Sequence, residues 1–414
     1  MTATQSAARP SLARSLTLLH ATLYGLGVTI GAGIYVLVGV AAARGGMHAP
    51  LAFVIGGILM ALSAASFAEL GGRFPVAAGE AAYARAAFAS HKLALVVGLL
   101  VVGIAIVSAA AISIGSAGYL SELVRLPSPL LVGAVVIAMG VIAAWGIRQS
   151  VTFAGVMTVI EIGGLVLLIV AGLGSDAPVF TRLPEIVPNT VNPATIAGLV
   201  GTILLAVFAF IGFESLANVA EEVQRPERTL PSAIFLTLLI ATVLYVSVVW
   251  IALVAVGPAD LARSNAPLGL VFERLTGASS RSMSVIAVVA TLNGIIVQII
   301  MASRVLYGLA SQGDLPAVFA QVHRRTRTPL VATATATALV LAFALIIPLH
   351  DLAEVTARLT LIVFAIVNVS LIVIKRRENS FATVGFVAPW WVPWAGAATC
   401  LLLLGLDLWT VVVT

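Results

Sequence analysis

One glutamate in the middle of an apolar segment is the residue of this chain best suited to chemistry. Glu161 lies in the stretch VTFAGVMTVIEIGGLVLLIVAGL, residues 151–173, which has no other charged side chain. A segment of roughly 20 apolar residues crosses a bilayer as a helix, and a carboxylate at its centre costs at least about 2.5 kcal/mol on insertion scales. Such groups usually face an ion or proton path. Glu161 is therefore a candidate proton or cation site, and the alternative is a structural carboxyl group that is hydrogen-bonded between helices.

The composition places the element that carries Glu161 in a membrane protein. The 414 residues are 61% hydrophobic and 9% charged, and the mean hydropathy is +1.13, whereas soluble domains have about 25% charged residues. The net charge of +5 is therefore no sign of nucleic-acid binding. The single cysteine, Cys400, cannot form an intramolecular disulfide.

Motifs that would indicate an enzyme are missing from the sequence. It contains no HExxH, no GxSxG and no Cys/His cluster, and these are the patterns that would supply metal ligands or an activated nucleophile. We therefore expect no catalytic residue, no bound metal and no cofactor.

The apolar pattern predicts eleven membrane-spanning helices. Short polar loops with Pro and Gly separate them, and the longest, 257–281, has room for a short helix. The predicted spans are residues 17–42, 51–70, 93–121, 128–145, 151–173, 194–222, 232–256, 282–310, 329–348, 352–374 and 391–412.

The distribution of Arg and Lys predicts the orientation. With the N-terminus in the cytoplasm, most of the 22 Arg and Lys residues, including the clusters HRRTR and KRR, fall on the cytoplasmic side. This asymmetry follows the positive-inside rule, and an odd number of spans then places the C-terminus outside. The first residues show no cleavable signal pattern, so we expect a multi-pass protein of the plasma membrane that retains its first span.

Two spans carry residues that favour a helix break. The first reads GVTIGAGIYVL, and unwinding is expected at Gly31, Ala32 and Gly33, because glycine costs about 1 kcal/mol in a helix interior; close helix packing is the alternative. The sixth reads LLAVFAFIGFESLANVAEEV, with Gly212 near its middle and Glu214 two residues later. Paired broken helices five spans apart indicate a transporter built from an inverted repeat.

Such breaks have a defined chemistry. The N-terminal end of a half-helix binds a carboxylate, and carbonyl groups that are freed at the end of the other half-helix bind an ammonium group or a cation. Two facing breaks therefore suit a zwitterion.

Five sequence motifs, in order along the chain, resemble the amino acid–polyamine–organocation (APC) family of permeases. They are GLGVTIGAGIYVLVG, FAELGGRFPVAAGEAAYARAAF, FAFIGFESLANVAEEVQRPERTLPSAI, NGIIVQIIMASRVLYGLASQGDLP and PWWVPWAGAATCLLLL. The resemblance implies an all-α integral membrane protein with the leucine-transporter fold. Residues 1–414 would form one domain, with inverted repeats at about 17–173 and 194–374 and a peripheral helix at about 391–412.

The resemblance also implies a substrate site beside spans 1, 3, 6, 8 and 10. A substrate carboxylate would meet the backbone amides of Gly31, Ala32 and Gly33. Its ammonium group would meet the carbonyl groups of Thr29, Ile30, Phe208, Ala209 and Ile211, next to the break at Gly212.

Two side chains of the sixth span have implied roles. Phe208 occupies the position of an aromatic gate over the substrate, although an ordinary apolar contact explains it too. Glu214 follows the break, where relatives often have a glutamate that braces the unwound segment or the gate.

The chain departs from the family pattern at Glu161, since several sodium-independent relatives have a lysine there. Two hypotheses follow. Glu161 binds a proton, because burial disfavours the charged form of a carboxyl group, or it ligates a cation together with span-1 carbonyls and polar groups of span 8 such as Thr291 and Asn293. We favour the proton, because span 8 has no cluster of Ser and Thr that would complete a sodium site.

The sequence therefore predicts a secondary active transporter, a proton-coupled symporter that takes up a neutral amino acid. No acidic side chain clearly faces the site, which favours a neutral substrate. The alternatives are an exchanger of cationic amino acids or polyamines, a sodium-coupled carrier, and a substrate-sensing membrane receptor. The expected partners are the small-molecule substrate, a proton or sodium ion, and the lipid bilayer, with no nucleic acid.

Overall fold

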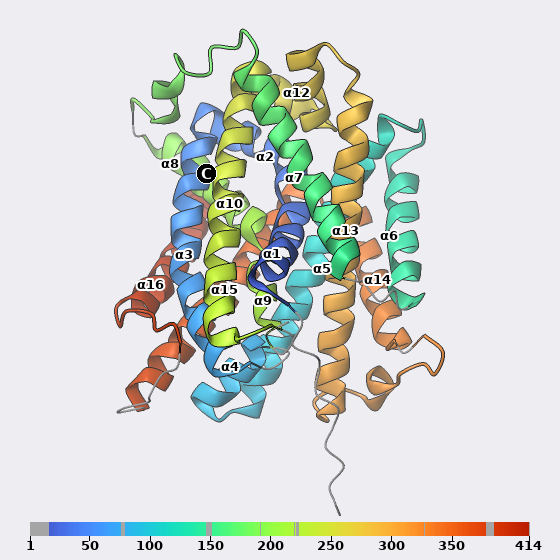
Figure 1. Ribbon diagram of the computed structural model, residues 1–414, viewed down its shortest axis with the longest axis vertical. Helices are drawn as coiled ribbons and strands as arrows, with labels where there is room; N and C mark the ends of the chain where they lie inside the picture. Colours follow the sequence, from blue (N-terminus) through green and yellow to red (C-terminus); the bar gives the residue numbers. More distant parts are fainter. Residues whose placement is uncertain are drawn as a thin grey trace, which may run out of the picture.

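The protein is a bundle of helices that run mostly along the long axis of the molecule (Figure 1). The structure, a computed structural model, describes residues 16–75, 79–145, 151–190, 192–218, 220, 223–326, 328–377 and 385–413. In these residues every regular element is a helix, apart from one parallel β-bridge between Leu16 and Val223.

Each of the eleven predicted spans contains a helix, so the expected all-α fold is confirmed. The first five are formed by α1 (Leu18–Ala32) with α2 (Ile34–Gly45), α3 (Ala49–Arg73), α5 (His91–Ser121), α6 (Ser128–Trp145) and α7 (Val151–Leu173). The other six are formed by α8 (Pro193–Phe210) with α9 (Ser215–Asn218), α10 (Pro226–Ala255), α13 (Ser280–Ser311), α14 (Leu330–Ile346), α15 (Leu349–Arg377) and α16 (Val392–Val413).

Short helices occupy several connections. They are α4 (Gly79–Phe88), α11 (Pro258–Arg263) and α12 (Pro267–Thr276). The last two fill the loop that was expected to hold one short helix. In Figure 1, α12 lies at the top of the molecule and α4 at the bottom, and we refer to these as the α12 end and the α4 end.

The helices are apolar around most of their circumference. Outward-facing residues such as Ile58, Val159 and Val170 are about 60% exposed, while the opposite faces pack into one continuous core. Among the described residues, nine helical segments are long and apolar enough to cross a membrane, and α1 and α14 are shorter apolar helices. A helix that is apolar on all sides fits a membrane span, because lipid replaces water around it.

Helix α15 is tied to its neighbours by ion pairs at both ends. At the α12 end, Glu354 pairs with Arg44 of α2 and with Arg358, which also pairs with Asp407 of α16 at 2.6 Å. At the α4 end, Lys375 lies 2.8 Å from the fully buried carboxylate of Glu69 on α3.

Two cations of the described residues contact Glu69, and replacing Lys375 by Met removes one of them, leaving Arg73 at 2.5 Å. We expect the free energy of unfolding to fall by about 2 kcal/mol, the size of a hydrogen bond to a charged group, as measured by unfolding in detergent. The exposed neighbour Arg377 is the control. An equal loss of stability in the Arg377→Met variant would contradict the assignment.

Glu80 on α4 generates a second prediction. Its side chain is only 4% exposed, and burial raises the pKa of this carboxyl group from 4.5 to about 7. The folded protein then binds the proton more tightly than the unfolded chain. The free energy of unfolding therefore falls as the pH rises from 4.5 to about 7, and above that range Glu80 causes no further decrease. The shift corresponds to about 3 kcal/mol.

The Glu80→Gln variant should therefore lack this part of the pH dependence of unfolding. Glu273→Gln changes an exposed carboxylate and should keep it. The two profiles are compared by unfolding in detergent between pH 4.5 and 8, and a Glu80→Gln profile that coincides with that of the unmodified protein would contradict the prediction.

Candidate functional site

The first span is interrupted at a single residue. Helix α1 ends at Ala32, α2 begins at Ile34, and Gly33 between them has φ −122° and ψ −75°. The Gly33 amide still donates to Ile30 O at 3.3 Å, so the break is narrower than the expected unwinding, and Gly31 stays helical. In the first turn of α2, the amides of Val36 and Leu37 both donate to Gly33 O at 3.1 Å, so backbone groups on each side of the break keep partners.

The sixth span has a wider break. Helix α8 ends at Phe210, a turn covers residues 211–214, and α9 starts at Ser215. Gly212 has φ +134°, a conformation that residues with a side chain rarely adopt. The Gly212 amide donates to Glu214 Oε2 at 2.8 Å, so this carboxyl group directly braces the unwound segment.

The two breaks lie against each other, and each glycine faces the backbone of the other span. A Cβ atom on Gly33 would lie 2.5 Å from Ala209 Cα, and one on Gly212 would lie 2.6 Å from Thr29 N. Neither distance is compatible with a side chain. Glycine at both positions is therefore what allows the two backbones to approach so closely.

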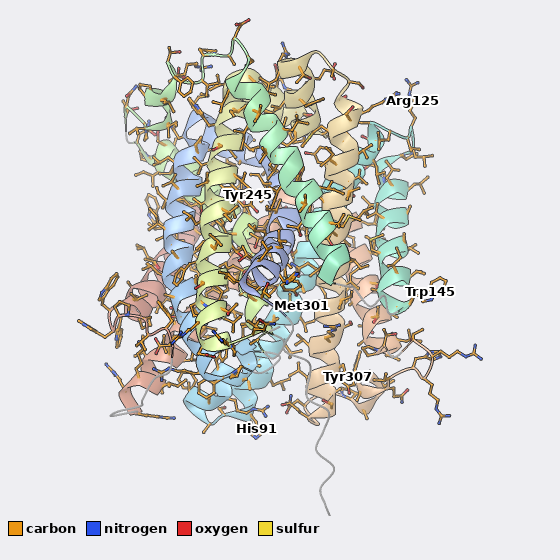
Figure 2. The ribbon with its side chains drawn as sticks, viewed as in Figure 1. His91, Arg125, Trp145, Tyr245, Met301 and Tyr307 are labelled. Atoms are coloured by element: carbon orange, nitrogen blue, oxygen red, sulfur yellow. The ribbon has the colours of Figure 1, made fainter. Side chains whose placement is uncertain are left out.

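Tyr245 joins the two broken spans. It lies on α10 (labelled in Figure 2), and its hydroxyl group is 2.9 Å from Thr29 O and 3.1 Å from Ala209 O. Its one O–H hydrogen can thus be shared between, or alternate between, two of the carbonyl groups that were expected to meet a substrate ammonium group. The sequence reasoning missed this residue, and its one signal was a tyrosine inside an apolar span.

Most of the other predicted carbonyl groups also have partners. Ile30 O accepts from Gly33 N, and Phe208 O accepts from Ile211 N at 3.2 Å. The side chains of Phe208 and Ile211 are buried. The structure thus brings the predicted substrate residues together in a closed arrangement, in which backbone groups and Tyr245 satisfy the carbonyl groups.

Glu161 lies on the other side of α1, close to the break. Its side chain is fully buried, its Oε1 accepts from Asn293 Nδ2 at 3.0 Å, and its Oε2 has no hydrogen-bond partner among the residues that the structure describes. A Cβ atom on Gly31 would lie 3.7 Å from Glu161 Oε1. Thr291 is oriented differently, because its hydroxyl group donates within α13, to Ala287 O at 2.8 Å or Val288 O at 3.0 Å.

No cation balances the charge of Glu161 within the described part of the chain, since none of the ion pairs found there includes it. The titratable groups that interact with it electrostatically include the hydroxyl groups of Tyr35 and Tyr245. A buried carboxylate without a cation is costly, whereas a protonated carboxyl group in the same place is neutral.

A cavity of about 470 Å³ opens at the α12 end. Its walls come from α2, α5, the connection between α11 and α12, and the start of α15, and include Tyr35, Arg44, Tyr119, Asn265 and His350. At the opposite end of α1, Gln224 N donates to Leu16 O at 2.9 Å, next to the Leu16–Val223 bridge. The chain before α1 is thus joined to the segment that precedes α10.

Comparison with known proteins agrees with this architecture. The family model for amino acid permeases matches residues 16–413. A methylthioribose transporter of Bacillus subtilis is 26% identical over 394 residues, which are 89% of this chain and 82% of the relative. A branched-chain amino acid permease of the same organism is 27% identical over 392 residues, with the same coverage.

A vacuolar cationic amino acid transporter of Arabidopsis thaliana is 30% identical over 391 residues, which are 88% of this chain and 60% of that relative. These relatives are transporters, as the two facing helix breaks indicate for this chain. The match to the family model extends over nearly every helix described above. The chain belongs to the amino acid permease family.

Proposed function

We propose that this permease is a proton-coupled symporter that takes up a neutral amino acid by alternating access. The observation that carries the proposal is the position of the last turn of α1, between the facing helix breaks and Glu161. Gly33, which directly follows this turn, contacts Ala209, and Gly31 within it lies beside the Glu161 carboxyl group. A change of charge at Glu161 therefore acts within one helical turn of the predicted substrate site.

The surroundings of Glu161 favour a proton over sodium. A sodium ion needs several oxygen ligands, and Thr291, the hydroxyl group expected to contribute, donates within its own helix. Asn293 approaches Glu161 with its amide nitrogen in the hydrogen-bond assignment, which suits a carboxyl group and not a metal ion. The unpartnered Oε2 can carry the proton.

The surroundings of the two breaks favour a neutral substrate. Apolar side chains, those of Ile30, Phe208 and Ile211, are buried there, and the Glu214 carboxylate is engaged with the Gly212 amide. The relatives include a branched-chain amino acid permease and a cationic amino acid transporter, so substrate class is the property to test first. The facing breaks supply backbone groups for the substrate carboxylate and ammonium groups.

Arg and Lys support the proposed orientation in the plasma membrane. Exposed cations of the α4 end include Lys92, Arg324, Arg325, Arg376 and Arg377, and basic residues concentrate in cytoplasmic loops. We propose that the α4 end is cytoplasmic, that the N-terminus is on this side and the C-terminus outside, and that the cavity at the α12 end opens to the outside. Arg148 and Arg327, which contribute to the same asymmetry, lie outside the described residues.

The Glu161→Gln variant tests proton coupling. It keeps a polar group beside Asn293 but cannot exchange a proton, so an inward proton gradient should no longer stimulate uptake, while exchange of substrate across the membrane persists. Uptake is measured in proteoliposomes with and without a pH gradient. The Glu122→Gln variant, which changes an exposed carboxylate, should respond as the unmodified protein does. An unchanged response to the gradient in Glu161→Gln would refute the proton role.

The Gly33→Ala variant tests the substrate site. The new Cβ atom would lie 2.5 Å from Ala209 Cα and force the two spans apart. We expect ligand stabilisation to disappear, which in the unmodified protein amounts to about 2.7 kcal/mol at a ligand concentration of 100 times Kd. It is measured by thermal unfolding in detergent against a panel of neutral, acidic and cationic amino acids and amines.

Gly133→Ala is the matched control, because a Cβ atom there has nothing within 4 Å. It should leave ligand stabilisation intact. If only cationic ligands stabilise the unmodified protein, the neutral-substrate assignment is wrong. If Gly33→Ala retains full stabilisation, the substrate does not bind at the two breaks.

A further inference from the structure

The cavity at the α12 end follows one face of α2. The residues of α2 that line it are Tyr35, Val36, Gly39, Val40, Ala43 and Arg44, a spacing of one, three and four residues that is typical of a single helix face. Tyr35 and Arg44 are nine positions apart, which corresponds to about 13 Å along the helix axis. The cavity therefore extends from the outer end of α2, where the Arg44 side chain is 34% exposed, to its first turn beside the break.

Tyr35 is the cavity-lining residue of α2 that lies nearest to the break. It has no solvent-exposed surface, and its hydroxyl group donates to the backbone carbonyl of Glu161 at 2.6 Å. The approach depends on Gly164, where a Cβ atom would lie 2.8 Å from the Tyr35 hydroxyl oxygen. One buried residue thus lies at the cavity wall and at the same time contacts, through its hydroxyl group, the residue that we propose as the proton site.

A second tyrosine holds Tyr35 in place. Tyr119 of α5 donates to Tyr35 O at 2.6 Å, and the Leu268 amide of α12 lies 3.4 Å from the Tyr119 hydroxyl oxygen. These hydrogen bonds connect α12, α5, α2 and α7 in sequence. Movement of α12 or α2 at the mouth of the cavity would therefore reach Tyr35.

We infer that the cavity is the outer access route to Glu161 and that Tyr35 is the gate that closes it. The inference rests on the proposed function, in which Glu161 exchanges a proton. Opening needs the Tyr35 hydroxyl group to leave the Glu161 carbonyl group, after which water in the cavity reaches the unpartnered Oε2. A hydronium ion in that water then gives its proton to Oε2 of the ionised carboxylate, which leaves a neutral carboxyl group and a water molecule.

The groups packed around Glu161 fit a route from this side. Helix α13 contributes Asn293, and the titratable groups that interact with Glu161 include Tyr35 of α2 and Tyr245 of α10. The Tyr245 hydroxyl group bridges Thr29 O and Ala209 O. Tyr35 alone of these two tyrosines also lines the cavity.

The test measures access to Glu161 directly. Glu161 is replaced by Cys in a Cys400→Ser background, which removes the one native thiol, and a membrane-impermeant methanethiosulfonate is added from outside to proteoliposomes of known orientation. Adding Tyr35→Ala should raise the labelling rate about tenfold or more, because it removes a hydrogen bond together with the ring. Tyr35→Phe, which loses only the hydroxyl group, should give a smaller increase.

Tyr307→Ala is the matched control, since this partly exposed tyrosine lies at the α4 end (Figure 2), and it should not change the rate. Asn293→Cys provides a second reporter if Glu161→Cys does not fold. Unchanged labelling of a folded reporter in Tyr35→Ala would overturn the gate.

A second measurement separates this inference from the proton role. With Glu161 intact and no substrate, Tyr35→Ala should let protons enter under an inside-negative potential, as detected with a pH-sensitive dye inside the vesicles. Adding Glu161→Gln should abolish that influx. Faster labelling without proton influx would support the gate and refute the proton role, whereas influx that survives Glu161→Gln would overturn the route through Glu161.

Discussion

The fold depends on how two interrupted helices are buried against each other. Inside a bilayer, backbone groups that leave a helix have no water to bind and must find partners within the protein. Here, Gly33 lies against the backbone at Ala209 and Gly212 against the backbone at Thr29, and the hydroxyl group of Tyr245 serves a carbonyl group of each span. Each break is tolerated because the other one is beside it.

This mutual burial explains why the same region suits transport. Backbone groups that are satisfied by a neighbouring break can exchange that partner for a substrate at little cost, which groups inside a continuous helix cannot do. The contacts that hold the two breaks are single hydrogen bonds. They come from the Tyr245 hydroxyl group and from the Glu214 carboxylate, which accepts from the Gly212 amide. Such contacts can re-form in a second arrangement of the spans, as alternating access requires.

Glu161 gains its significance from the same packing. Only two positions along the chain separate the contact of Gly33 with α8 from the contact of Gly31 with α7 and α13. Movement at one of these contacts reaches the other, because a densely packed protein interior does not absorb the displacement of a helix locally. The ion pairs at both ends of α15 hold this helix to α2 and α3 on either side of the central region.

The sequence by itself determined the eleven spans, the two breaks and the isolated carboxyl group, because bilayer thickness, the cost of glycine in a helix and the cost of a buried charge are local properties of a segment. Only the tertiary structure decided which residues meet. It reduced the first break to Gly33, since the Gly33 amide keeps its bond to Ile30 O. It also distinguished the two span-8 candidates beside Glu161, because Asn293 donates to the carboxyl group whereas Thr291 donates within its own helix. It also brought Tyr245 to both breaks, because contacts between distant helices depend on how the helices cross, which no local pattern encodes.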